Sequence, residues 1–193
     1  MRFAYADPPY IGQASKHYRR HASYAGEVDH RELIARLVDE FRDGWALSAS
    51  SPSLRTILPL CPERVRVMAW VKPFCSFKKG VNPAYAWEPI ILCGGRRRSA
   101  ESMYVRDWVS APMTTGRGVS GAKPELFCVW LFEVLGAEPG DDLVDLFPGS
   151  GAVQQAWRRW QAQTQLHLYV PRSSKRSSGR THAVNSSQPK LFE

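Results

Sequence analysis

The sequence contains no apolar run approaching the ~20 residues that a membrane-spanning helix needs. Its first residues, Met1 to Asp7, include no apolar core of a secretory signal, so we expect a cytoplasmic protein. Its four cysteines form no Cys-x-x-Cys pair, which predicts reduced, packed thiols rather than disulfides or zinc ligands. His17 and His21 have a spacing that could hold a metal on a helix, but no carboxylate or thiol lies nearby, which disfavours a metal site.

Acidic residues are absent from the C-terminal part of the chain, because neither Asp nor Glu occurs between Leu146 and Phe192. The whole chain of 193 residues has 26 Lys and Arg against 18 Asp and Glu, a formal net charge of +8. Residues 171–193 combine five basic side chains with six serines, a composition typical of disorder. We therefore expect one folded domain over residues 1–170 and a disordered basic tail over residues 171–193.

Outside this tail, three short clusters of basic residues stand out, each in a predicted loop. The residues that we expect to contact nucleic acid are Lys16, Tyr18, Arg19, Arg20, Lys78, Lys79, Arg96 and Arg97. Clustered cations favour a polyanionic partner, and an interleaved tyrosine can stack on a base. For residues 12–26, a mobile lid over a bound cofactor is the alternative interpretation.

Strand patterns alternate with helix patterns along residues 1–170. Strands are predicted at residues 2–6, 45–50, 65–70, 88–93, 142–147 and 166–170, and helices at 52–60, 123–135 and 152–161. A further helix follows Asp29, its predicted N-cap, with Leu33, Ile34, Leu37, Val38 and Phe41 on one face. This alternation predicts a doubly wound, mostly parallel α/β sheet, in which ligands bind outside the carboxyl ends of the strands.

A glycine turn, Phe147-Pro148-Gly149-Ser150-Gly151, joins a predicted strand to a predicted helix. Its bare backbone and the free N–H groups of the following helix allow the polar end of a cofactor to approach closely. The turn is neither a P-loop nor a full dinucleotide fingerprint. Tight packing between strand and helix is the other interpretation.

The tetrapeptide Asp7-Pro8-Pro9-Tyr10 directly follows the first predicted strand. An exocyclic amine on a base is a weak nucleophile because its lone pair is delocalised into the ring. A carboxylate and a proline-fixed carbonyl that accept its two N–H groups favour a pyramidal nitrogen and free the lone pair for attack. Tyr10 adds a flat face on which a flipped base can stack. The other interpretation is a proline-rich turn against which Tyr10 packs.

Together, the two motifs resemble those of the S-adenosylmethionine-dependent DNA amino-methyltransferases. Their order, with the catalytic motif first, resembles the circularly permuted β-type group in a compact phage- or bacterium-encoded form. Lys123-Pro124 before the glycine strand and the segment Trp87-Glu88-Pro89 are also similar to that group. The segment Trp70-Val71-Lys72-Pro73 resembles the eukaryotic mRNA adenosine methyltransferases.

The resemblance implies a Rossmann-like methyltransferase that transfers a methyl group from S-adenosylmethionine to adenine N6 in DNA, with Asp7, Pro8, Pro9 and Tyr10 as catalytic residues. An Asp at the first motif position favours adenine over cytosine in this family. The residues that the resemblance places around the cofactor are Ala6, Asp7, Lys123, Asp145, Phe147, Pro148, Gly149, Ser150 and Gly151. The alternatives are a cytosine-N4 or RNA adenine methyltransferase, and a catalytically silent nucleic-acid-binding protein of the same fold.

One part of the family pattern is missing from this sequence. Family members usually follow the glycine turn with a strand that ends in an acidic residue, which binds the ribose of the cofactor. The predicted strand at 166–170 ends in Pro171 instead, so we expect a sheet truncated at its cofactor-side edge. Either neutral side chains hold the ribose, or a partner chain completes the pocket, or cofactor binding has been lost. The neutral candidates are Gln161, Gln163, Gln165 and His167.

The last six residues, Gln188-Pro189-Lys190-Leu191-Phe192-Glu193, resemble the short peptides with which bacterial replication and repair proteins dock on the sliding clamp. Gln188 suits a polar subsite, and Leu191 and Phe192 suit a hydrophobic pocket. A flexible peptide of this kind binds weakly because its ordering entropy opposes binding. The alternative is that Leu191 and Phe192 pack back on the domain.

Overall fold

The computed structural model describes residues 1–12, 27–75, 77, 79–114 and 122–169, with the last five of these described as backbone only. Several predicted residues lie outside this part of the chain. They are the nucleic-acid candidates Lys16, Tyr18, Arg19, Arg20 and Lys78, the histidines His17 and His21, and the proposed clamp-binding residues Gln188, Leu191 and Phe192.

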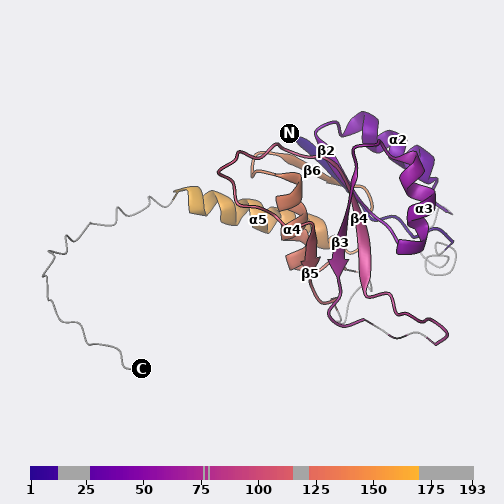
Figure 1. Cartoon of the computed structure of the whole chain (residues 1–193). Helices are drawn as coiled ribbons and strands as arrows, with labels where there is room; N and C mark the ends of the chain where they lie inside the picture. The colour runs from indigo at the N-terminus through magenta and orange to yellow at the C-terminus, as the bar shows by residue number, and fades with distance from the viewer. Residues whose placement is uncertain (13–26, 76, 78, 115–121, 170–193) are drawn as a thin grey trace, which may run out of the picture.

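The described residues form a single six-stranded sheet with the order β5-β3-β4-β2-β1-β6 (Figure 1). The strands are β1 (Arg2–Ala6), β2 (Gly44–Ser48), β3 (Arg66–Val71), β4 (Trp87–Gly94), β5 (Trp108–Ser110) and β6 (Asp142–Asp145). β1 pairs in parallel with β2 and β6, and β3 pairs in parallel with β5, whereas β4 is antiparallel to both of its neighbours. The predicted mostly parallel α/β sheet is confirmed.

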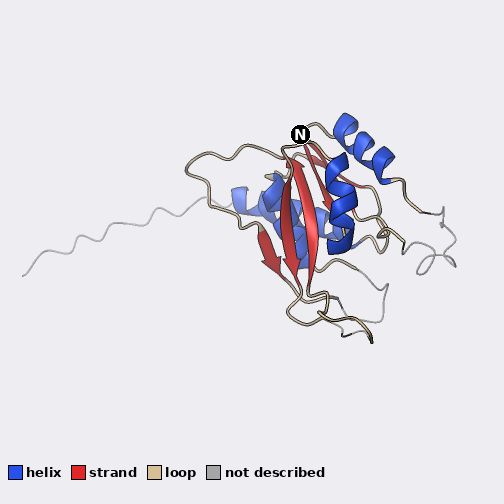
Figure 2. Cartoon of the chain, turned by 45° about the vertical axis from the view of Figure 1, so that its right-hand side comes forward, coloured by secondary structure: helices blue, strands red, loops and turns tan. Residues whose placement is uncertain are grey.

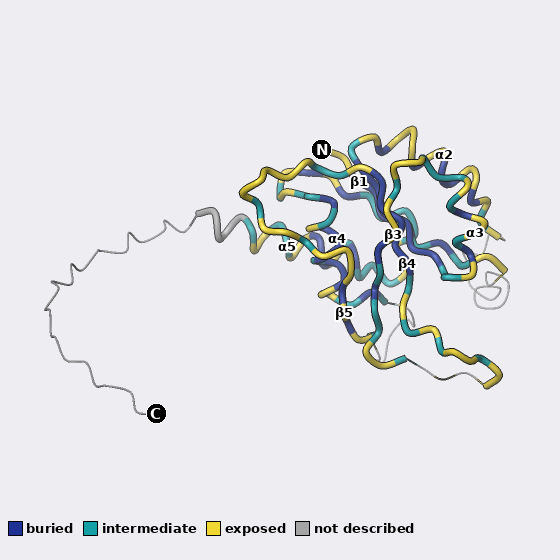
Figure 3. The backbone as a smooth tube through the Cα atoms, viewed as in Figure 1, coloured by how far each residue is buried: buried dark blue, intermediate teal, exposed yellow. Residues whose placement is uncertain are grey.

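Helices cover both faces of this sheet (Figures 1 and 2). One face carries α2 (His30–Glu40) and α3 (Leu54–Ile57), the second flanked by single 3₁₀ turns, and the other carries α4 (Glu125–Leu135) and α5 (Ala152–Tyr169). Successive side chains of β1 lie on opposite faces of the sheet. Phe3 and Tyr5 pack with α4, and Ala4 and Ala6 pack with α2. The buried positions therefore concentrate along the sheet, as Figure 3 shows.

Helix α2 begins where the sequence predicts. The Asp29 carboxylate accepts hydrogen bonds from the backbone N–H groups of Arg31 (2.8 Å) and Glu32 (3.1 Å), so the predicted N-cap is confirmed. The apolar face is narrower than predicted, because Val38 is exposed while Leu33, Ile34 and Leu37 are buried. No helix of the described residues is long and apolar enough to cross a membrane.

The predicted strand at residues 166–170 is wrong, because α5 continues to Tyr169. Val153, Ala156 and Trp157 are buried at helical spacing and fix the first turns of α5 against α4. No Gly or Pro interrupts the chain between Ala152 and Tyr169, so a helix that has begun extends at little cost. Among the described residues, β6 is consequently an edge strand of the sheet.

Arg96 joins several segments at the end of the sheet where β4 finishes. Its guanidinium donates to the Gly136 carbonyl (2.9 Å) and to the Asp141 carboxylate (2.7 Å). That carboxylate also accepts from the N-terminal ammonium of Met1 and from the Glu138 N–H (2.7 Å). Because the Asp141 side chain is only 5% exposed, its loss would leave these donors without their shared acceptor.

We therefore expect Asp141→Ala to lower the free energy of unfolding by about 3 kcal/mol, as for other buried ion pairs that lose one partner. The matched control is Asp107→Ala, since Asp107 forms an exposed pair with Arg66 at 3.4 Å and should contribute less than about 1 kcal/mol. Urea unfolding followed by circular dichroism measures both. Equal effects of the two substitutions would contradict the assigned role of Asp141.

Candidate functional site

Five polar residues meet at one end of the sheet, where most of its strands finish, and we call this end the functional edge. β1, β2, β3 and β6 run in the same direction, so their carboxyl ends share this edge, and the antiparallel β4 begins there. Asp7 follows β1, Ser48 ends β2 and Lys72 follows β3. Glu88 lies at the start of β4, and Asp145 ends β6. This edge is where ligands bind in open α/β sheets.

Lys123 connects the charges at this edge. It precedes α4, and its Nζ lies 3.1 Å from Asp7 Oδ1 and 3.1 Å from Glu88 Oε2, with only 6% of the side chain exposed. The second Glu88 oxygen accepts from Lys72 Nζ. The Trp70 ring lies beneath both ammonium groups, 4.9 Å from Lys123 Nζ and 5.0 Å from Lys72 Nζ. We call Asp7, Lys72, Glu88 and Lys123 the buried charge network.

Opposite charges favour the ionised forms of Lys123 and Glu88. Burial lowers the pKa of Lys123, but the carboxylates of Asp7 and Glu88 outweigh it and place the pKa above its ordinary value. Burial likewise raises the pKa of Glu88, but Lys123 and Lys72 outweigh it and the pKa lies below its ordinary value. Asp7 differs, because burial raises its pKa more than Lys123 lowers it. Asp7 is thus the member of the network that gains most from a further hydrogen-bond donor.

The Ser48 hydroxyl influences Asp7 from the side of β2. The buried hydroxyls of Tyr5 and Ser48 are 2.7 Å apart, and Ser48 lowers the pKa of Asp7, against the effect of burial. Pro8, the residue after Asp7, is buried, and Tyr10 is half-buried. Packing therefore restrains this part of the predicted motif. Burial raises the pKa of Tyr5 well above its usual range, with the Asp7 charge adding to the effect, so Tyr5 remains a neutral hydroxyl.

The glycine turn lies beside Asp7 because β6 pairs with β1. Asp145 is paired with Tyr5 in the sheet, and its carboxylate accepts from the Phe147 N–H at 3.2 Å. Gly149 and Gly151 have φ values of 47° and 74°, the left-handed region that glycine adopts without strain. Burial raises the pKa of Asp145 to about 6, with Asp7 adding to the effect and the Phe147 N–H opposing it.

The other predicted cofactor residues lie along these two segments. Ala6 is buried in β1 and faces the core beneath α2. In the turn, Pro148 is exposed and Ser150 is half-buried. Helix α5 begins directly after this turn at Ala152, so its first N–H groups face the same edge of the sheet.

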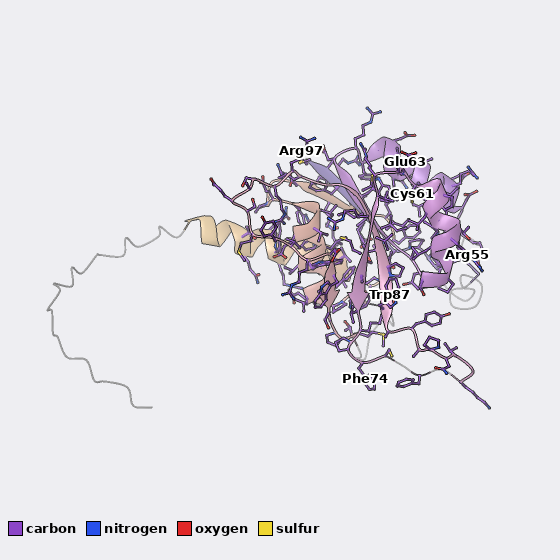
Figure 4. All side chains as sticks on the ribbon, viewed as in Figure 1. Arg55, Cys61, Glu63, Phe74, Trp87 and Arg97 are labelled. Carbon is purple, nitrogen blue, oxygen red and sulfur yellow. The ribbon has the colours of Figure 1, made fainter. Side chains whose placement is uncertain are left out.

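The basic candidates that the structure describes, Lys79, Arg96 and Arg97, do not come together. Arg97 is exposed at the end of the sheet opposite Trp87, and both residues are labelled in Figure 4. Arg96 at that end is held by Asp141 and Gly136, as described above. Lys79 is exposed in the segment between β3 and β4, on the side of the buried charge network. Only Lys79 of the described basic candidates therefore lies near the site.

Sequence reasoning left Lys72, Glu88 and Ser48 out of the site. Lys72 and Glu88 appeared only inside segments that resemble a family, and nothing marked Ser48. The sequence did contain a signal for them, since each of these polar residues lies at the end of an apolar strand. The hydrogen-bonded pairing of strands stops there, and a ligand can approach.

The sequence matches no family profile and no curated protein. In structure the chain is similar to a crystal structure of the M1.HpyAVI–SAM complex, with a TM-score of 0.56 and 15% identity over 83% of this chain and 78% of that chain. It is also similar to a crystal structure of M1.HpyAVI, with a TM-score of 0.50 and 14% identity over 83% and 76% of the two chains. The likeness at this identity is one of fold alone, and the six-stranded α/β sheet of this chain belongs to that shared fold.

Proposed function

We propose that this protein transfers a methyl group from S-adenosylmethionine to the exocyclic N6 amine of adenine in DNA. The observation that carries the proposal is the parallel pairing of β1 with β6. It makes the Asp7–Tyr10 motif and the glycine turn leave neighbouring strands at the same edge of the sheet. The structural neighbour M1.HpyAVI, solved with SAM, supports the choice of cofactor.

The residues at this edge fit the methionine end of the cofactor. An ammonium group suits the carboxylate of Asp145, and a carboxylate suits the N–H groups at the start of α5. Gly149 is open, since a Cβ built on it would meet nothing closer than the Phe147 carbonyl oxygen at 3.8 Å. The bound cofactor supplies an electrophilic methyl group on a positively charged sulfur, which is a good leaving group.

The chain's own residues act on the amine. Asp7 and the Pro8 carbonyl accept its two N–H groups, which favours a pyramidal nitrogen with a free lone pair. Lys123 holds the Asp7 carboxylate in place before the base arrives. With the cofactor bound, these residues would align the nitrogen with the methyl carbon, so that the nitrogen–carbon bond would form as the methyl–sulfur bond breaks. The proton lost from the nitrogen would pass to the Asp7 carboxylate that already accepts its N–H. Positioning of this in-line displacement supplies most of the acceleration.

A catalytically silent nucleic-acid-binding protein is the second candidate. It is favoured by the absence of any acidic residue between Leu146 and Phe192, which leaves no carboxylate for the cofactor ribose. The Asp7 motif opposes this candidate, since a binding protein does not need a half-buried carboxylate beside a proline-fixed carbonyl. Transfer of labelled methyl from S-adenosylmethionine to DNA, followed by nucleoside analysis, separates the candidates. N6-methyladenine supports the proposal, whereas N4-methylcytosine, label in RNA alone or no label contradicts it.

Asp7→Ala should reduce methyl transfer by about a hundredfold or more, because it removes an acceptor that the reacting amine needs. The fold should survive, since Lys123 keeps Glu88 as its partner. The measurement is the single-turnover rate with a methyl-labelled cofactor, with circular dichroism to check the fold. Asp39→Ala is the control, because Asp39 is an exposed residue of α2, and it should leave the rate unchanged. A turnover of Asp7→Ala close to that of Asp39→Ala would show that Asp7 is not the acceptor.

Gly149→Val should weaken S-adenosylmethionine binding by about tenfold, because a β-branched residue resists the left-handed φ at this turn. Titration calorimetry measures the change. Gly140→Val is the matched control, since Gly140 has open space around it and lies away from the turn. Wild-type affinity in Gly149→Val would exclude the turn from the cofactor site.

Binding of S-adenosylmethionine should also depend on pH through Asp145. The raised pKa, about 6, means that the folded protein protonates this carboxyl when the pH falls below that value. Affinity should therefore be full above pH 7 and fall by about tenfold per pH unit well below about 6, as for a single titrating carboxylate. Asp145→Asn should bind weakly at every pH. Asp142→Asn, an exposed neighbour on β6, should keep the wild-type profile, and a flat wild-type profile would contradict the assignment.

A further inference from the structure

The segment between β3 and β4 exposes an unusual number of large aromatic side chains. Phe74 is 75% exposed, Phe77 83% and Tyr85 53%, and Trp87 at the start of β4 is also exposed. We call residues 73–87 the aromatic loop. Figure 4 shows Phe74 below the ends of the strands, where this loop leaves β3, and Figure 3 shows the described part of the loop as a mixture of exposed and half-buried residues. Grouped exposed rings on a folded domain mark an interaction surface.

The aromatic loop is attached directly to the functional site. It begins after Lys72 and ends before Glu88, and these two residues pair within the buried charge network. The Lys72 N–H also donates to the Ala86 carbonyl at 2.8 Å, which closes the base of the loop. In Figure 1 the loop extends beyond the ends of β3 and β4, away from the N-terminus of the chain. A ligand held by the loop therefore lies next to the edge that carries Asp7.

The charge of the loop indicates which kind of partner it fits. Residues 73–87 contain no Asp or Glu, and their only charged residues are Lys78 and Lys79. An aromatic surface with positive charge alone matches a polyanion that carries flat apolar rings. Unpaired bases on a phosphate backbone have both properties, and base–aromatic stacking is tolerant of sequence.

We propose that the aromatic loop binds a single-stranded stretch of nucleic acid, with Phe74, Phe77 and Tyr85 stacking on unpaired bases beside the reacting one. The proposal rests on the proposed function for the choice of ligand. Lys79 contacts the phosphates and contributes the salt dependence of binding. The site as a whole then captures bases that are already unpaired, which spares the cost of extruding a base from a duplex.

The test is the binding of a fluorescein-labelled single-stranded dT oligonucleotide of 20 nucleotides to the full chain, measured by anisotropy without S-adenosylmethionine. Phe74→Ala and Tyr85→Ala should each weaken binding by about tenfold, the usual loss for one base–aromatic stack. Phe74→Trp, which keeps a ring for stacking, should bind the oligonucleotide as tightly as the wild type. The matched control is Tyr104→Ala, because Tyr104 is 97% exposed on the segment that leads from β4 to β5, at the other end of the sheet.

Several outcomes would overturn the proposal. These are equal affinities of Phe74→Ala, Tyr85→Ala and Tyr104→Ala, tighter binding of a duplex than of the single strand, or no binding by the wild type. Dimers that dissociate in Phe74→Ala, without oligonucleotide binding, would assign the loop to a second copy of the chain. A matching RNA oligonucleotide decides which sugar is preferred. Oligonucleotide binding through the loop without methyl transfer would contradict the proposed function alone, and methyl transfer with unaffected loop variants would contradict this inference alone.

Discussion

The arrangement at the functional edge depends on the ammonium group of Lys123. A buried lysine is stable only when its charge is matched, and here Asp7 and Glu88 each lie 3.1 Å from Nζ. The three residues come from the segment before α4, the end of β1 and the start of β4. Their contacts therefore fix a helix and two strands relative to one another. They also hold the Asp7 carboxylate in a defined position, which a reaction that relies on positioning requires.

The direction of β4 makes this arrangement possible. In a fully parallel sheet, only carboxyl ends of strands would meet at the ligand edge, and Glu88 at the start of its strand would lie at the other end. Because β4 is antiparallel, Glu88 joins Asp7, Ser48 and Lys72, and the connection from β3, residues 72–86, returns as a long hairpin loop. That same hairpin is the aromatic loop. One reversed strand thus supplies both a partner for Lys123 and an exposed surface beside the reacting groups.

The two ends of the sheet have different roles. At the end where β4 finishes, Arg96, Asp141 and the N-terminus form contacts that join segments of the fold. At the other end, paired charges are largely withdrawn from solvent, and Gly149 has a left-handed φ although a Cβ there would meet only the Phe147 carbonyl oxygen, at 3.8 Å. Charges and backbone conformations of this kind are typical of a functional site.

The sequence by itself determined the local features: β1 and its Asp-Pro-Pro stop, α2 with its Asp29 cap, and the glycine turn that leads into α5. Each depends on residues close together in the chain, where periodicity, capping and proline geometry act directly. Tertiary structure decided that Lys72, Glu88 and Lys123 share one network and that Arg96 is held by Asp141. These outcomes depend on which strands become neighbours and on burial, because charge pairing is selected by contacts between residues far apart in sequence.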